Sequence, residues 1–197
     1  MNIFDTGNEE LKPFYTLEEF PKFKWLVSQY PIILNELNKN TFWMKWGSDS
    51  ADPSGHCMFL SGDWTVCPVY FGKYEPQMMR VPGVKPDDLE KMVQYLPQLF
   101  PNITELLKNI DNINFSAFSR LHSKSTLAPH KHTNPESLIF HLGLIIPPEN
   151  SCGLKVADKT HTWSKPGDAV IFNDNFQHSA WNHSEQERII LYVDFKR

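Results

Sequence analysis

The sequence contains no run of basic residues. Lysine and arginine are scattered along the chain, the formal net charge at pH 7 is −4, and the pI is near 6.0. Proteins that bind DNA, RNA or anionic membranes mainly through charge concentrate positive side chains in one patch. Nucleic acids and anionic membranes are therefore not expected as the main partners.

Cysteine is scarce. The three cysteines, Cys57, Cys67 and Cys152, form neither a CxxC pair nor a zinc-finger spacing, which argues against a disulfide framework and a structural zinc site. No uninterrupted apolar stretch approaches the roughly 18 residues that a spanning helix needs. The N-terminal residues carry acidic side chains where a secretory signal would be apolar. We expect a cytoplasmic protein with reduced thiols and no transmembrane segment.

Glycine-rich phosphate-binding motifs are also missing. Neither GxGxxG nor GxxxxGKS/T occurs, and the chain has no internal repeat or low-complexity tract. Nucleotide-binding folds are therefore disfavoured.

The N-terminal part has helical patterns divided by prolines. Thr16 and Glu19 have the spacing of a capping box. Four short helices are expected, the third ending before Pro97 because proline disrupts a helix interior. Their ranges are Thr16 to Leu26, Pro31 to Asn38, Pro86 to Leu96, and Ile103 to Ile110.

Large aromatic side chains gather in residues 42–46 and 58–74, and the second stretch predicts one or two strands. Such aromatic residues usually pack in the core. The alternative is that Trp64 or Tyr70 lines a substrate cleft.

After Asp111 the chain becomes rich in short β-prone runs. Turn residues such as Pro147 and Pro148 separate them, with no long helix between. This pattern predicts a mainly β fold, a double-stranded β-helix (a cupin-like jelly roll) with the N-terminal helices packed on it. We expect a single domain over residues 1–197, with an N-terminal elaboration over about 1–112 and the jelly-roll core over about 113–197. The expected strands are Phe115 to Leu121, Leu138 to Ile146, Leu154 to Ala157, Ala169 to Phe172, and Ile189 to Phe195.

Five histidines lie on or beside these strands: His122, His130, His132, His141 and His178. A single histidine is more often a surface or hydrogen-bonded core residue than a ligand. A jelly roll, however, has an open mouth where distant strands converge, and neutral imidazoles bind iron, copper, nickel or zinc. We therefore predict that His130 and His178 form one metal site assembled by folding.

Arg188 follows His178 by ten residues, across the polar turn at residues 182–185. If that turn closes a hairpin, the guanidinium enters the barrel on the neighbouring strand, where it suits a carboxylate in bidentate geometry. The alternative is a surface arginine.

From about Phe118 to Phe195 the chain resembles the aspartyl/asparaginyl β-hydroxylase family of Fe(II)- and 2-oxoglutarate-dependent oxygenases, which is also similar to bacterial enzymes that hydroxylate lipid A acyl chains. The matching pieces are Ser119, Pro129-His130, His141-Leu142-Gly143-Leu144, Trp163, Phe172-x-Asp174-x-Phe176-x-His178-x-x-Trp181, Arg188 and Val193-Asp194.

The resemblance implies that His130 and His178 bind Fe(II). It also implies that Arg188 and Ser119 receive the distal carboxylate of 2-oxoglutarate, while His141 approaches its other end. With O2, such an enzyme hydroxylates an unactivated C–H of an Asp- or Asn-like residue, an amino acid or a related small-molecule or peptide substrate. Asp174 would hold metal-bound water or orient a ligand; the alternative is an Asx turn.

Two positions depart from the patterns of these oxygenases. Most 2-oxoglutarate oxygenases have Asp or Glu two residues after the first histidine; this family lacks it, and here the position is His132. His132 is a third ligand, a residue that supports a ligand, or a surface residue, and we expect one of the last two. Family members often have an arginine at the position of Ile139, so another donor, such as His132 or Lys155, would be needed here.

Two further hypotheses stay open. One is a cupin-like enzyme in which His130, His132 and His178 hold a metal without 2-oxoglutarate; the other is a non-catalytic jelly-roll binding protein. In the oxygenase hypothesis, substrate choice depends on the N-terminal segment, near Trp43, Trp46, Trp64 and Arg80.

Overall fold

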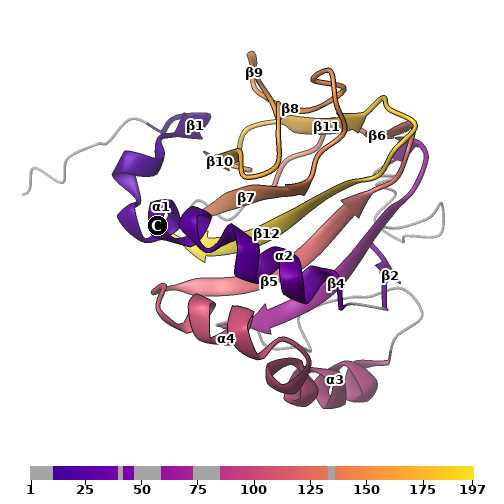
Figure 1. Cartoon of the computed structure of the whole chain (residues 1–197). Helices are drawn as coiled ribbons and strands as arrows, with labels where there is room; N and C mark the ends of the chain where they lie inside the picture. Colours follow the sequence, from indigo (N-terminus) through magenta and orange to yellow (C-terminus); the bar gives the residue numbers. More distant parts are fainter. Residues whose placement is uncertain (1–10, 40–41, 47–58, 73–84, 133–135) are drawn as a thin grey trace, which may run out of the picture.

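Two antiparallel sheets face each other in a jelly roll (Figure 1). The computed structural model describes residues 11–39, 42–46, 59–72, 85–132 and 136–197. The seven-stranded sheet has the order β1 (Phe14–Tyr15), β10 (Ala169–Phe172), β7 (Ser137–Ile145), β12 (Arg188–Lys196), β5 (Ile113–Leu121), β4 (Trp64–Phe71) and β2 (Met44–Lys45). The five-stranded sheet has the order β3 (Phe59–Ser61), β6 (Ser125–Leu127), β11 (His178–Asn182), β8 (Cys152–Val156) and β9 (Lys159–Thr162). The predicted mainly β, jelly-roll fold is confirmed.

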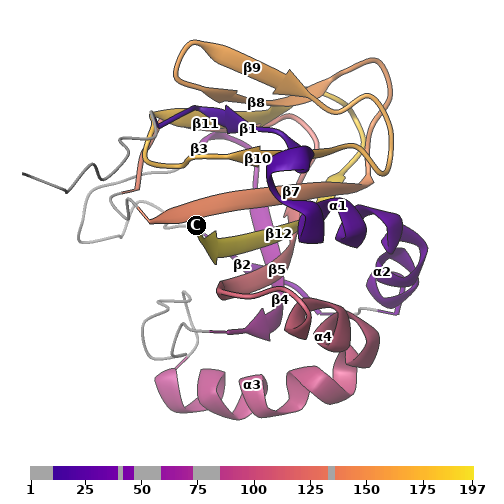
Figure 2. The same ribbon diagram turned by 90° about the vertical axis from the view of Figure 1, so that its left-hand side faces the viewer.

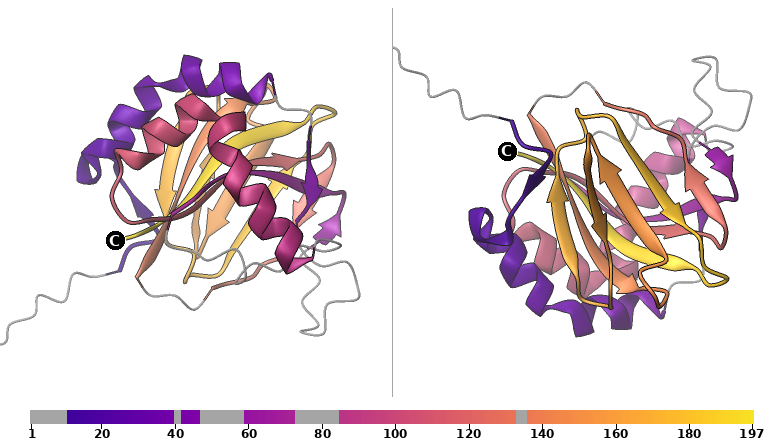
Figure 3. Two further views of the ribbon diagram at one scale, coloured as in Figure 1. Left: turned by 90° about the horizontal axis from the view of Figure 1, so that it is seen from below. Right: turned by 90° about the horizontal axis from the view of Figure 1, so that it is seen from above.

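Helices cover one face of the large sheet, and the small sheet lies over the other (Figure 2). They are η1 (Leu17–Glu19), α1 (Pro21–Ser28), α2 (Tyr30–Leu37), α3 (Pro86–Leu99) and α4 (Pro101–Lys108). Seen from below, the helices lie in front of the strands; seen from above, the strands lie in front of the helices (Figure 3). Among the described residues, none of these helices is long and apolar enough to cross a membrane.

The two faces of the large sheet pack in two different hydrophobic cores, one under the helices and one between the sheets. On β12, Leu191 and Val193 pack in the core under the helices, whereas Ile190 packs between the sheets. Successive strand residues point to opposite faces, so Arg188 shares the inter-sheet face with Ile190. On β7 the same alternation places Phe140 in the helical core and leaves its neighbours facing the small sheet.

Two of the helix predictions need correction. The Thr16 capping box forms, but it opens the 3-10 helix η1, and the first α-helix begins separately at Pro21. The other α-helices begin within two residues of their predicted starts. The expected stop before Pro97 is wrong, because α3 includes Pro97 and ends at Leu99. The flanking residues Leu96 and Phe100 are buried and joined by a backbone hydrogen bond of 2.8 Å, so packing offsets the missing proline N–H.

The five strands expected after Asp111 are all present, as β5, β7, β8, β10 and β12. Three short strands in the same part of the chain were not predicted: β6, β9 and β11. The buried positions of β11 include the polar residues His178 and Asn182, so this strand lacks an apolar alternation. Of the cysteines, Cys67 and Cys152 are buried, and Cys57 lies outside the described residues.

Candidate metal centre and carboxylate pocket

A cavity of about 140 Å³ lies between the two sheets. Its wall includes His130, His132, His141 and His178, together with Ser119, Asp174 and Arg188. Aromatic and aliphatic side chains form the rest of the described wall. Side chains of the kind that bind metals and a buried cation therefore line the same cavity.

His130 and His178 are held together by the backbone. The N–H of His130 donates to the carbonyl of His178 at 2.9 Å, and the N–H of His178 donates to the carbonyl of His130 at 2.8 Å. Residues that exchange both hydrogen bonds in an antiparallel pair project their side chains to the same face. The two imidazole centroids are accordingly 4.2 Å apart. Folding thus brings together the two histidines that the sequence singles out.

Carbonyl groups orient both imidazoles. His130 Nδ1 lies 2.7 Å from the carbonyl oxygen of Ala128, and His178 Nδ1 lies 3.0 Å from that of Phe176. A carbonyl can only accept, so each Nδ1 carries the proton and each Nε2 keeps a lone pair for a metal. Burial lowers the pKa of His130, and burial together with His130 lowers the pKa of His178 to about 4. Both rings are therefore neutral at pH 7.

His132 joins this pair. Its backbone N–H donates to the carbonyl of Asp174 at 2.9 Å. One ring nitrogen each from His130, His132 and His178 lies within 4.8 Å of the others. His132 is exposed, in keeping with one of the roles expected for it, but the structure also groups it with the two predicted ligands.

Asp174 lines the cavity and is 7% exposed. Its Oδ1 has no hydrogen-bond partner in the described part of the chain. Burial, with Asp194 nearby, raises the pKa of Asp174 to about 7. The Asx turn considered for this residue is instead formed by Asn173, whose Oδ1 accepts the N–H of Asn175 at 3.0 Å.

Arg188 is a buried cation, 2% exposed. Its Nε and Nη1 have no hydrogen-bond partner among the residues described, and its Cζ lies 5.2 Å from the Trp163 ring centre. Burial lowers the pKa of Arg188 to about 10, so the group is still charged at pH 7. A buried guanidinium without an anion is costly, and a bound carboxylate would satisfy it.

Arg188 reaches the cavity, but the hairpin that was expected to bring it there does not form. β11 pairs with β6 and β8, whereas β12 pairs with β5 and β7. The turn between β11 and β12 therefore crosses from the small sheet to the large one and closes no hairpin. Arg188 reaches the cavity because the alternation of β12 turns it inward.

Further polar groups near Arg188 lack partners. Both ring nitrogens of His141 and the indole nitrogen of Trp163 are buried without hydrogen bonds in the described structure. Burial, with Arg188 nearby, holds the pKa of His141 well below its usual value, so the ring is neutral and offers one N–H. Ser119 accepts the Trp64 indole N–H at 2.8 Å, which leaves the serine's own proton to donate. One cation with several neutral donors fits an anionic ligand.

Trp163, for which no role was predicted, packs beside Arg188 and His141, although it is not among the residues that line the cavity. Its ring lies 6.0 Å from that of His141, nearly parallel to it. A Cβ atom at Gly143 would lie 3.1 Å from Trp163 Cδ1 and 2.8 Å from Ile146 Cδ1, so glycine leaves space for this packing. The sequence did contain a clue to this packing, because Gly143 and Trp163 both belong to the matched family motifs.

Lys155 does not supply the hydrogen-bond donor that would replace the arginine found in family members at the position of Ile139. Lys155 is exposed, while its β8 neighbours Leu154 and Val156 are buried between the sheets. Lys155 therefore points away from the cavity. Ile139 itself is 1% exposed and lines the cavity, which makes this part of the wall apolar.

Aromatic side chains form the wall away from Arg188. Trp46 stacks on Phe115 with centroids 5.8 Å apart and meets Trp64 edge-on at 6.0 Å, and all three line the cavity. Of the two roles considered for Trp64, lining a cleft therefore fits the structure better than packing only in the core. Trp43 instead packs under Arg120, whose Cζ lies 4.2 Å from its ring centre. Arg80 lies outside the described residues.

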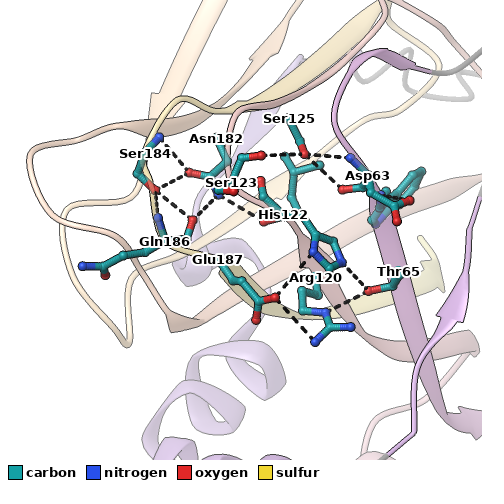
Figure 4. Close-up of polar contacts among 12 residues, drawn as sticks. Asp63, Thr65, Arg120, His122, Ser123, Ser125, Asn182, Ser184, Gln186 and Glu187 are labelled. Atoms are coloured by element: carbon teal, nitrogen blue, oxygen red, sulfur yellow. Dashed lines mark hydrogen bonds and ion pairs between the residues drawn. The ribbon is translucent and has the colours of Figure 1, made fainter.

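Asn182 fixes the turn that leads to Arg188 (Figure 4). Its Nδ2 lies 3.1, 3.0 and 2.7 Å from the carbonyl oxygens of Leu121, His122 and Gln186. Its Oδ1 accepts from the backbone N–H and hydroxyl of Ser184 at 3.2 and 2.7 Å. The residue is fully buried. It therefore ties the β11–β12 turn to the end of β5.

A second polar group lies beside this turn (Figure 4). Glu187 lies 3.6 Å from Arg120 Nη1 and 3.5 Å from His122 Nδ1. Arg120 also donates from Nε to Thr65 Oγ1 at 2.9 Å. Because Glu187 precedes Arg188 and Arg120 follows Ser119, these contacts join the strands that present the two candidate carboxylate-binding residues.

The sequence profile of the family described as aspartyl/asparaginyl beta-hydroxylase matches residues 28–197. The chain belongs to this family. Residues of the family motif form the cavity described above, with His130, His141, His178 and Arg188 on its wall. The family assignment suggested by the sequence is confirmed.

Two relatives of this chain are named as hydroxylases. The chain is 33% identical over 96 residues to an ornithine lipid ester-linked acyl 2-hydroxylase from Rhizobium tropici, covering 48% of this chain and 34% of that protein. It is 36% identical over 77 residues to the aspartyl/asparaginyl beta-hydroxylase of Mus musculus, covering 39% of this chain and 10% of that protein. The matches thus span about a third or less of these relatives.

Weak matches among solved structures include cupin domains. A cupin 2 conserved barrel domain protein from Rhodopseudomonas palustris aligns with a TM-score of 0.42 and 8% identity, covering 78% of this chain and 70% of that one. A predicted oxalate decarboxylase from Thermotoga maritima aligns with a TM-score of 0.36 and 17% identity, covering 47% and 73%.

Proposed function

We propose that the protein is an Fe(II)- and 2-oxoglutarate-dependent hydroxylase. Its principal support is the buried Arg188, whose Nε and Nη1 have no hydrogen-bond partner in the described structure, in the same cavity as His130 and His178. In this proposal the two histidines hold Fe(II) through Nε2. Iron, O2 and 2-oxoglutarate would together supply the oxidation of an unactivated C–H to an alcohol, with 2-oxoglutarate converted to succinate and CO2.

The protein's own groups bind and orient the co-substrate. The Arg188 guanidinium, with the Ser119 hydroxyl, receives the distal carboxylate. The neutral imidazole of His141 donates to the same ligand and compensates for the cation that family members often have at the position of Ile139. The Trp163 ring packs against the Arg188 guanidinium and holds it in place. A preorganised set of donors keeps the co-substrate in one pose at low cost when it binds.

Asp174 acts as a positioning group. Its Oδ1, unpartnered in the described structure, faces the cavity that also holds the histidines. A carboxyl there can hydrogen-bond water or a ligand beside the metal without coordinating it. This role distinguishes Asp174 from Asn173, which stabilises the turn.

The proposed substrate presents an unactivated C–H of an Asp- or Asn-like residue or a related molecule, as the name of the mouse relative indicates for that protein. The described wall favours a second candidate, an aliphatic acyl chain. Trp46, Trp64, Val66, Phe115 and Ala117 form it, and an apolar wall binds CH2 groups well but leaves polar substrate groups unpaired. The name of the Rhizobium tropici relative points to the same class.

The proposal is tested by product formation. Purified protein is incubated with Fe(II), ascorbate, O2 and 2-oxoglutarate, with peptide or acyl-lipid substrates, and succinate is quantified. Wild type should form succinate, Arg188→Met should lose at least about tenfold of this activity, and the control Arg197→Met should retain it. Turnover of a substrate without succinate would favour the three-histidine enzyme, and metal binding without turnover would favour a binding protein.

A further inference from the structure

We propose that His132 is a third protein ligand, so that three imidazoles and no carboxylate hold the metal. This inference rests on the metal site of the proposed function but changes its ligand set. It makes the centre differ from the two-histidine pattern implied by the family and from the two-histidine, one-carboxylate pattern of most 2-oxoglutarate oxygenases.

The backbone places His132 on the correct face. The segment from His130 to His132 lies alongside the segment from Asp174 to His178, joined by the paired hydrogen bonds of His130 with His178 and by the bond from the His132 N–H to the Asp174 carbonyl. These bonds hold His132 beside the pair of His130 and His178, and its ring lies on the side where their rings meet.

The ring positions agree with this backbone register. The His132 centroid lies 5.6 Å from that of His130 and 5.7 Å from that of His178. A ligand nitrogen from each ring lies within 4.8 Å of the other two. Nitrogen ligands bind such metals at about 2.1 Å, which places them roughly 3 Å apart, a difference that small side-chain rotations can close.

A carboxylate does not replace His132 in this group. Among the described residues, the cluster whose donor atoms all lie within 4.8 Å contains histidines alone, and Asp174 is not a member. Neutral ligands leave the full charge of a divalent ion in the cavity, whereas a carboxylate would cancel part of it. The metal itself would then attract an anionic co-ligand more strongly than a centre that includes a carboxylate.

The ligand number can be counted with Cu(II) as the probe. Pulsed electron paramagnetic resonance of the Cu(II)-loaded protein detects the remote nitrogen of each coordinated imidazole. We expect three imidazoles in the wild type and two in His132→Ala and His132→Gln. His183→Ala, which removes an exposed histidine outside the cluster, should keep three.

Binding of Co(II), followed by calorimetry, gives a second readout. His132→Ala should weaken Co(II) binding by about tenfold or more, while His183→Ala should leave it unchanged. Equal far-UV circular dichroism and melting temperatures of the metal-free variants show that the fold is intact. Two imidazoles in the wild type, or the same Co(II) affinity in a folded His132→Ala, would overturn the proposal.

These outcomes are separate from those that test the proposed function. Three imidazoles together with no 2-oxoglutarate turnover would contradict the oxygenase and leave the three-histidine centre standing. Two imidazoles together with succinate production would overturn the three-histidine centre alone.

Discussion

His130 and His178 exchange both of their backbone hydrogen bonds, at 2.9 and 2.8 Å, and their side chains meet on one face of that pair. The candidate metal site is thus built at a point where the main chain itself is paired. Its geometry depends on the register of the jelly roll and does not depend on a free loop.

Metal binding should therefore stabilise the fold. A ligand that binds only the folded state raises stability by about 2.7 kcal/mol at a concentration of 100 times its Kd. We expect Co(II) to raise the melting temperature of the wild type and a chelator to reverse the shift. In His178→Ala the shift should be lost, while a control variant at the exposed His183 should respond like the wild type. An equal shift in all three proteins would place the metal elsewhere.

Asn182 should be required for both stability and co-substrate binding. Its replacement by Ala leaves the carbonyls of Leu121, His122 and Gln186 without this donor, with an expected cost of about 2–4 kcal/mol in urea unfolding. The variant should also bind 2-oxoglutarate more weakly, because the turn before Arg188 loosens. The matched change Asn109→Ala, which removes one exposed hydrogen bond, should cost less than about 1 kcal/mol. Similar losses in the two variants would argue against this role.

Trp163 should contribute by holding the Arg188 guanidinium, which packs over its ring. Trp163→Leu removes this cation–π contact, so 2-oxoglutarate affinity should fall by roughly tenfold. Lys155→Ala should have no effect, because Lys155 points to solvent. Calorimetric titration of the Fe(II)-loaded variants in the absence of O2 measures both. A loss in Lys155→Ala as large as that in Trp163→Leu would contradict this role of Trp163.

His141 should make stability depend on pH. Its folded pKa lies well below the value of about 6.5 in an unfolded chain, so its contribution is complete above pH 6.5 and is lost as the pH falls below it. As the pH falls below about 6.5, the unfolded imidazole takes up a proton that the folded one does not, so the free energy of unfolding decreases. Urea unfolding of the wild type and His141→Asn at pH 7.5 and 5.0 tests this. The variant should lose less stability on acidification, and an equal loss would show that His141 does not titrate in this way.

Much of the fold follows from local pattern. The strands β5, β7, β8, β10 and β12 correspond to apolar runs, and burial of such runs decides strand formation. β11 escaped prediction because its buried residues include the polar residues His178 and Asn182. Nδ1 of His178 bonds the carbonyl of Phe176 just before the strand, and the Asn182 amide bonds the carbonyl of Leu121 on β5. The prediction for Pro97 failed because packing of Leu96 and Phe100 outweighs the local preference of proline.

Part of the candidate site could be predicted from the types of its residues alone. An imidazole pair and a buried arginine stand out by type, so His130, His178 and Arg188 could be proposed without a structure. The sequence offered His132 as one possible third ligand but favoured other roles, because its grouping with the pair depends on a backbone bond to Asp174. The role of Asn182 depends on the carbonyl of Leu121 at the end of β5. Such contacts exist only after folding.

The central claim is that this cavity binds 2-oxoglutarate beside a divalent metal. Titration of 2-oxoglutarate into Fe(II)-loaded protein without O2, followed by calorimetry, tests it most directly. We expect saturable binding by the wild type, at least about tenfold weaker binding by Arg188→Met, and binding in both that depends on the metal. Absence of binding by folded, metal-loaded wild type, or equal affinity in Arg188→Met, would contradict the claim.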